Sequence, residues 1–238
     1  MSGAESSLRA RAVALLRRAG LSGLAKGLLR HLRMLTRRVV YVGEYYVYRY
    51  APPEVDPDAN RPQVDGLEVR VLDSLGDLRA LVEFGYEDPR TRAVAVENRL
   101  AAGAVAVCGF VNRRLAYVGW VAMSQPAKHS FDRLPYHVAF DSGEAATGGA
   151  WTAPEYRGVG LYRYMFGREL ALLRHRGRTV CCNAIGVGNY PSQRGQACYG
   201  AHVCARARLV RVLGRTRWTE TPMSGPCPSL SGEPGGDT

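Results

Sequence analysis

The sequence predicts an α/β protein, more closely an α+β arrangement built on one mixed sheet. From Leu67 onward, short runs of β-branched and apolar residues alternate with segments in which apolar residues recur at helical spacing. Of the 238 residues, 46% are apolar and 22% are charged, which is typical of a soluble globular protein. A chain of this length is expected to form one domain with extensions, or two small domains.

The first 38 residues form a basic extension. They contain nine basic residues and one acid, Glu5, and so supply +8 of the net charge of +11. Leucines at helical spacing predict a basic amphipathic helix over residues 7–38. The helix is expected either to pack on its own domain or on a second subunit, as in a homodimer, or to make a peripheral contact with an anionic membrane. Binding to nucleic acid is disfavoured, because no aromatic stacking platform accompanies the charge.

Residues 39–66 are expected to connect this extension to the main domain. Residues 39–50 are β-branched and aromatic throughout, which predicts a strand. Residues 51–66 are rich in proline and polar residues, which favours a linker or surface loop.

The main domain is expected over residues 67–220. Its first elements are a strand at 67–72 and a helix at 74–86, with Ser74 as the N-cap. Two apolar runs joined by a polar turn then predict a hairpin, with strands at 104–111 and 115–123.

A fourth strand is expected at 144–152, and it leads into a helix over 161–175. Gly177 is well placed as the C-terminal cap of that helix. The remaining expected elements are a fifth strand at 179–185, a short helix at 190–200, one or two closing strands at 202–214 and a disordered tail from 221 to 238.

No metal site is expected. None of the six cysteines forms a C-x-x-C pair, and the five histidines include no H-E-x-x-H motif. The chain also has no apolar run of about 18 residues and no secretory signal at its start. We therefore expect a cytoplasmic protein. The alternative is that residues 7–38 bind it peripherally to the inner face of the membrane.

The segment from Arg157 to Tyr162 is a candidate phosphate loop. It contains Gly158 and Gly160, follows a strand and opens a helix. The start of a helix offers unpaired N–H groups to an anion, and glycines let the backbone approach it closely. The dinucleotide fingerprint is not met, because Arg163 stands where its third glycine would be, and no Walker lysine is present. The alternative is that the glycines only make a sharp strand-to-helix turn.

This segment resembles a known family. "APEYRGVGL" is similar to the R-x-x-G-x-G/A loop of the GCN5-related N-acetyltransferases, the GNAT superfamily. "NYPSQRGQACYGA" resembles a second family segment, with Asn189, Ser192 and Gly200 in register. The resemblance covers roughly residues 67–217. It implies a single GNAT fold, in which strands 144–152 and 179–185 splay apart to admit the pantetheine arm of acetyl-CoA.

The resemblance also implies a set of residues that bind acetyl-CoA. Main-chain groups near two residues of the fourth strand would pair with pantetheine, and the turn amides would hold the pyrophosphate. Two polar residues of the second segment would line the far side of the arm. The implied cofactor-binding residues are Trp151, Thr152, Arg157, Gly158, Val159, Gly160, Leu161, Tyr162, Asn189 and Ser192.

The sequence departs from the family pattern at two positions. Tyr162 stands where the family prefers glycine or alanine, so its side chain must point away from the phosphates. Gln196 occupies the position of the family's usual general-acid tyrosine, and glutamine cannot protonate a thiolate. Tyr199 is the nearest substitute, and the alternative is that it is simply a packed aromatic residue.

Glu144, at the start of the fourth strand, is the preferred candidate for the general base. We expect it at a strand edge near the mouth of the cleft, and the alternative is a solvated strand-end carboxylate. His137, Asp141 and Glu97 are further candidates, and ordered water could also relay the proton.

The expected function is acetyl-CoA-dependent N-acetyl transfer to a small-molecule amine, such as an amino-sugar or another metabolite, in a ternary complex. Two alternatives remain: a GNAT-fold binding or regulatory protein without catalysis, and a membrane-associated transferase of a longer acyl chain.

Overall fold

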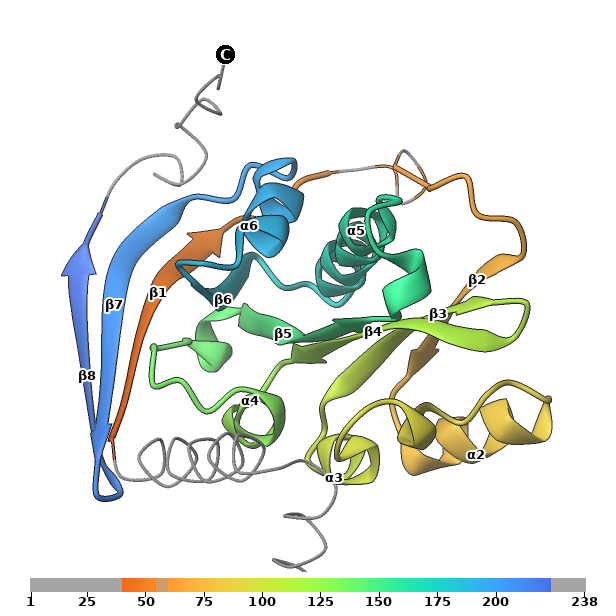
Figure 1. Ribbon diagram of the computed structural model, residues 1–238, viewed down its shortest axis with the longest axis horizontal. Coiled ribbons are helices and arrows are strands. Elements are labelled where there is room, and N and C mark those ends of the chain that lie inside the picture. Colours follow the sequence, from red (N-terminus) through yellow and green to blue (C-terminus); the bar gives the residue numbers. More distant parts are fainter. Residues whose placement is uncertain (1–39, 55, 57, 59, 224–238) are drawn as a thin grey trace, which may run out of the picture. The chain divides into compact units, whose positions relative to one another are not determined.

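The computed structural model describes residues 40–54, 56, 58 and 60–223 (Figure 1). The expected basic helix at 7–38 lies outside the described residues, as does the chain from 224 onward. Eight strands form a mixed sheet in the order β2-β3-β4-β5-β6-β1-β7-β8, and this confirms the mixed α/β class. The strands are β1 (Val40–Tyr50), β2 (Leu67–Leu72), β3 (Val105–Val111), β4 (Arg114–Ala122), β5 (Glu144–Thr152), β6 (Val180–Gly186), β7 (Val203–Val212) and β8 (Arg215–Pro222).

The helices among the described residues are α2 (Leu75–Glu83), α3 (Val96–Ala101), α4 (Gln125–Phe131), α5 (Leu161–His175) and α6 (Tyr190–Ala197). The predicted caps are confirmed. The Ser74 side chain accepts a hydrogen bond from the Asp77 N–H at the start of α2. Gly177 ends α5 with a φ of 70°, a left-handed conformation that glycine adopts without strain.

Residues 44–207 and 220–223 belong to one compact unit. Within it, α2, α3 and α4 lie on one side of strands β3 to β5, and α5 and α6 lie on the other (Figure 1). The α5 side of the sheet buries Tyr117, Met165 and Leu170, and Trp120 is also completely buried. The expected hairpin of β3 and β4 is present, and its turn residues Asn112 and Arg113 both have positive φ.

The second unit comprises residues 40–43 and 208–219 among those described. It contains the first residues of β1 and the hairpin between β7 and β8. The hairpin turns at Leu213 and Gly214, which have φ values of 48° and 81°.

Three details differ from the sequence prediction. β1 was expected to precede the main domain, but it pairs with β6 from Tyr45 to Tyr50 and so belongs to the sheet. β8 was not foreseen as a separate strand, and it extends to Pro222, past the expected start of the tail at 221. α3 and α4 were not predicted, because each is short and has little periodicity.

Two negative findings apply to residues 40–54, 56, 58 and 60–223 only. No helix in these ranges is long and apolar enough to cross a membrane. No three histidine, cysteine, aspartate or glutamate residues in them come together as a potential metal site.

Candidate functional site

Strands β5 and β6 part in the middle of the sheet. They pair in parallel over only three positions, and the last pair is Ala146 with Cys182. β5 nevertheless continues along β4 to Thr152, while β6 continues along β1 to Gly186. One position past the last pair, the Asn183 amide donates a hydrogen bond of 3.1 Å to the Thr147 hydroxyl. Beyond the last backbone pair, β5 and β6 leave a slot between them. The hydrogen bond between the Asn183 and Thr147 side chains closes the base of this slot.

β5 has a bulge beside this slot. Val118 of β4 pairs with Trp151 of β5, and Trp120 of β4 pairs with Gly148 of β5. Two residues of β5, Gly149 and Ala150, therefore oppose a single residue of β4, Gly119. Gly149 has a φ of 58°, in the left-handed region. A bulge interrupts the ladder and leaves the extra residue unpaired. Both bulge residues are exposed, although they lie in a central strand.

Two cavities follow the slot. The inner cavity has a volume of about 230 Å³ and lies between β5, β6 and the facing sides of α5 and α6. The outer cavity has a volume of about 630 Å³ and extends from the end of β5 to the start of α5. Both are lined by Ala150, Tyr162, Asn189 and Ser192. The two cavities therefore adjoin, forming one channel from the glycine turn to the parted strands.

The glycine turn forms the outer end of this channel. Gly158 and Gly160 have φ values of 80° and 84°, which side chains rarely adopt. A Cβ atom at either position would meet no protein atom within 4 Å, so the backbone here faces open space. The first intrahelical bond is donated by the Tyr164 N–H to the Gly160 carbonyl. The N–H groups of Leu161, Tyr162 and Arg163 have no acceptor within the helix, so they are available to an anion.

Positive charge surrounds the same end of the channel. The Arg157 Nε atom donates a hydrogen bond of 3.1 Å to the Thr152 carbonyl, which joins the turn to the end of β5. Arg157 and Arg163 both line the outer cavity. Among the described residues, neither guanidinium group forms a salt bridge.

Tyr162 does not fill the outer cavity. Its ring points between α5 and α6 and stacks on the Phe166 ring, with the two ring centroids 6.1 Å apart. The ring also lies close to Gly195 of α6, where an added Cβ would be only 2.6 Å from Tyr162 Cε1. The Gln196 amide donates a long hydrogen bond of 3.4 Å to its hydroxyl. Burial raises the pKa of Tyr162 to about 12, so the phenol keeps its proton at neutral pH. Its position at the junction of the two cavities agrees with the expectation that the ring avoids the turn.

α6 supplies polar groups to the other side of the channel. The Asn189 side chain caps α6 by accepting a hydrogen bond of 3.4 Å from the Ser192 N–H. Asn183 Oδ1 and Gln196 Oε1 are buried and have no hydrogen-bond partner among the described residues. Both residues line the inner cavity. A ligand N–H could satisfy each oxygen, and leaving a buried polar atom unpaired costs about 1–3 kcal/mol.

Glu169 is a functional candidate that the sequence analysis missed. It is 2% exposed, lines the inner cavity, and accepts a hydrogen bond of 2.7 Å from the Tyr117 hydroxyl. Burial raises the pKa of this carboxyl to about 8, although the Tyr117 hydrogen bond acts to lower it. Its carboxylate occupies the space over Gly119, where a Cβ would overlap Glu169 Oε1. Glu169 therefore lies beside the bulge of β5.

Glu144 does not line either cavity, so the expectation that it lies near the cleft mouth is wrong. It begins β5, in the part of the strand that is paired with β6. Its carboxylate forms an ion pair with Arg49 and accepts a hydrogen bond of 2.7 Å from the Ala139 N–H. Burial acts to raise the pKa of Glu144, but Arg49 and the Ala139 N–H together lower it below its usual value. A base role for Glu144 stays an untested prediction that the geometry does not favour.

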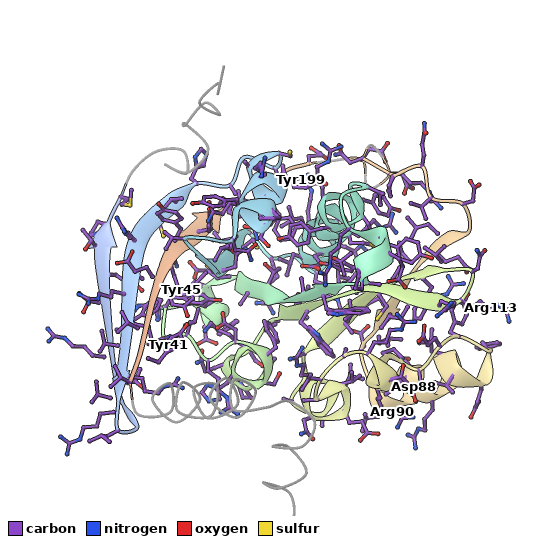
Figure 2. The ribbon with its side chains drawn as sticks, in the orientation of Figure 1. Tyr41, Tyr45, Asp88, Arg90, Arg113 and Tyr199 are labelled. Carbon is purple, nitrogen blue, oxygen red and sulfur yellow. The ribbon has the colours of Figure 1, made fainter. Side chains whose placement is uncertain are left out.

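Tyr199 also lies away from the channel. It lies just past the end of α6 (Figure 2). Its hydroxyl donates a hydrogen bond of 2.8 Å to the Arg163 carbonyl, and its ring packs against Phe166. The packed-aromatic interpretation therefore agrees with the structure better than the acid role. Of the other base candidates, Glu97 pairs with Arg90, while His137 and Asp141 are exposed and do not line the channel.

Nine of the ten expected cofactor-binding residues line the outer cavity. The exception is Val159, whose side chain is exposed on the turn. The nine are Trp151, Thr152, Arg157, Gly158, Gly160, Leu161, Tyr162, Asn189 and Ser192.

Comparison with known proteins gives structural matches only. No family model matches the chain, and no curated protein matches it. Among solved structures, a putative GNAT acetyltransferase from Novosphingobium aromaticivorans matches at 16% identity and a TM-score of 0.46, covering 71% of this chain and 63% of its own. A GCN5-related N-acetyltransferase from Sphaerobacter thermophilus matches at 14% identity and a TM-score of 0.44, covering 87% and 59%.

A third match is an acetyltransferase of the GNAT family from Colwellia psychrerythraea, at 14% identity and a TM-score of 0.44, covering 76% of this chain and 60% of its own. The matches thus span about three fifths of the length of these three solved chains. Acetyltransferases of the GNAT family are among the solved structures to which this chain is similar.

Proposed function

We propose that the protein is an acetyl-CoA-dependent N-acetyltransferase of the GNAT type, acting on a small-molecule amine. One observation supports this most strongly: a single channel connects a glycine turn at a helix start with a slot between two parted strands. The turn is suited to a pyrophosphate, and the slot is suited to an extended polar arm.

The residues present suit acetyl-CoA in charge and in hydrogen bonding. The free N–H groups at the start of α5, together with Arg157 and Arg163, would hold the phosphates. The unpartnered oxygens of Asn183 and Gln196 would accept from the two amide N–H groups of the pantetheine arm. The edge of β5 between its bulge and Thr152 would pair with the same arm.

When bound, acetyl-CoA supplies an acetyl thioester, from which the acetyl carbon passes to the amine nitrogen while the sulfur leaves as a thiolate. The bulge at Gly149 and Ala150 would present main-chain N–H groups to the thioester oxygen. The Tyr162 phenol is protonated and can donate to the departing sulfur. Glu169 is the one carboxylate lining the two cavities within the described residues, and we assign it the proton given up by the amine.

The inner cavity favours a short acyl group. Thr147, Glu169, Asn183 and Gln196 give polar lining to a space of about 230 Å³. Burying a long hydrocarbon chain against these groups would leave their polar atoms unpaired. We therefore favour acetyl over the longer acyl chain.

A binding protein without catalysis is the second candidate, because Gln196 replaces the usual acid. The test is release of free CoA thiol from acetyl-CoA, measured with the full chain against a panel of primary amines that includes amino-sugars. Amine-dependent thiol release, with acetylated product identified by mass spectrometry, supports the transferase. Tight binding of acetyl-CoA without turnover of any amine would indicate the binding protein, and absence of binding would contradict both.

A further inference from the structure

Arg99 lies beside the β5 bulge, on the side of the sheet away from α5. It belongs to α3, and its guanidinium group stacks over the Trp120 ring, with Cζ 5.0 Å from the ring centroid. A Cβ placed on Gly149 would be 3.3 Å from Arg99 Nη1 and 3.2 Å from the Trp120 ring. Gly149 also lines the inner cavity. The guanidinium group is therefore next to the bulge of β5.

This arginine has no acid to neutralise it. It is half-buried, and no carboxylate among the described residues forms a salt bridge or hydrogen bond with it. Its Nε atom is buried without an acceptor, as is the indole N–H of Trp120. Burial lowers the pKa of Arg99, and no neighbouring acid acts in the opposite direction.

The other stacked arginines in the same unit, Arg70 and Arg113, are both exposed to solvent, whereas Arg99 is half-buried. Arg70 stacks on Tyr86 at 5.2 Å, and it also pairs with Glu68 at 2.6 Å. A desolvated cation without a counter-charge is costly unless a partner arrives. The arrangement at Arg99 is one that a ligand anion would complete.

The position of Arg99 indicates which ligand would bring that anion. The channel for acetyl-CoA is lined by α5 and α6, whereas Arg99 and the neighbouring Phe131 come from α3 and α4, on the opposite side of β5 (Figure 1). An acceptor amine can approach the bulge only from a side that the acyl donor does not occupy. Arg99 Nη1 lies on that other side of the bulge, 3.3 Å from where a Cβ on Gly149 would be.

We propose that Arg99 anchors an anionic group of the acceptor, so that the substrate is a primary amine that also bears a carboxylate or a phosphate. This deepens the proposed acetyltransferase function and rests on it. A guanidinium group presents a planar fork of donors that matches either anion with two parallel hydrogen bonds. Stacking on Trp120 holds the plane of that fork in place.

The experiment uses the full chain, saturating acetyl-CoA and matched pairs of amines. Glucosamine and glucosamine 6-phosphate differ by a phosphate, and tyramine and tyrosine differ by a carboxylate. We expect kcat/KM to be at least tenfold higher for the anionic member of at least one pair, since charge-assisted hydrogen bonds contribute about this much. The pair that shows the larger ratio identifies the anion.

Three variants assign the preference to the residue. Arg99→Met keeps a stem of similar length over Trp120, and it should lower the ratio of kcat/KM between the anionic and the neutral amine to about one. Arg99→Lys should retain part of the preference, because the charge remains but the fork is lost. Arg70→Met is the matched control, a stacked arginine remote from the channel, and it should leave the preference unchanged.

Acetyl-CoA affinity and far-ultraviolet circular dichroism are measured for every variant, to show that fold and donor site are intact. If amines are acetylated without regard to their charge, or if Arg99→Met keeps the anionic preference, the subsite is overturned while the transferase function stands. If Arg99→Met does not fold, Arg99→Lys tests the proposal instead. A preference of Arg99→Lys for the anionic amine equal to that of the wild type would overturn the bidentate anchor. If acetyl-CoA binds but no amine of either pair reacts, the subsite is overturned, and the panel of primary amines described above decides the transferase function.

Discussion

The buried carboxyl of Glu169 makes a quantitative prediction about stability and pH. Its pKa in the folded protein is about 8, against an ordinary value of 4.5, so the folded state holds a proton that the unfolded state releases. A carboxyl with a raised pKa does not penalise the fold below pH 4.5, and it lowers stability as the pH rises from 4.5 to 8. In this window each pH unit costs about 1.4 kcal/mol.

The variant Glu169→Gln isolates this effect. Glutamine keeps an oxygen that can accept from the Tyr117 hydroxyl, and it has no proton to lose. Between pH 5 and pH 7, we expect the wild type to lose about 3 kcal/mol of unfolding free energy relative to the variant, from the slope of about 1.4 kcal/mol per pH unit. Urea denaturation followed by tryptophan fluorescence at each pH measures both proteins.

The control for this series is Glu83→Gln, at the exposed end of α2. Its unfolding free energy should follow that of the wild type at every pH, because the side chain faces solvent. Parallel curves for the wild type and Glu169→Gln over the same range would refute the assignment of a protonated Glu169, and with it the role that we give to this group in the cavity.

Three further predictions follow from the same contacts. Gly119→Ala should displace the Glu169 carboxylate, because the new Cβ would overlap Glu169 Oε1, and we expect lower acetylation activity and a lower Tm. Gly188→Ala is the control and should change neither quantity, because a Cβ there meets no atom within 4 Å. Arg49→Met should destabilise the protein at pH 7 by about 2 kcal/mol, because it leaves Glu144 buried and charged. The lowered pKa of Glu144 gives the wild type stability that is present above about pH 4.5 and lost as the pH falls; denaturation of Arg49→Met should therefore approach the wild-type curve toward pH 4. Acetylation rate should rise with pH toward about 8 in the wild type as Glu169 ionises, and a Glu169→Gln profile with the same rise would contradict its assignment as the base.

The start and end of α5 could be predicted from the sequence because glycine conformations are local. Gly160 and Gly177 each adopt a left-handed backbone at one end of the helix, and the apolar spacing between them predicts the face that packs on the sheet. The same local pattern predicts a phosphate loop at this turn, and that role stays a prediction. The turn indeed faces open space at both of its glycines.

Glu169 could have been found by the same reasoning. It follows Met165 by four residues and precedes Leu173 by four, so it lies on the apolar face of α5. An acid on an apolar helix face must be buried, paired or functional. The sequence contains that signal, although it does not show that Tyr117 would be the partner.

Other features depend on long-range pairing, which local patterns do not specify. Glu144 was placed near the cleft because it lies on the correct strand, but the strands part only after Ala146. β1 was recognised as a strand, and nothing local indicates that it would pair with β6. The significance of Arg99 depends on a bulge whose register is set by β4. None of these could be derived from periodicity.

The most direct test of the donor site is calorimetric titration of acetyl-CoA into the full chain, compared between Gly160→Ala and Gly177→Ala. Both glycines have positive φ, at 84° and 70°, and both have open space at the Cβ position, so the two substitutions impose similar strain at opposite ends of α5. We predict that the wild type and Gly177→Ala bind acetyl-CoA equally well and that Gly160→Ala binds at least tenfold more weakly. Equal affinity in the two variants, or no binding by the wild type, would contradict a thioester channel that begins at the glycine turn.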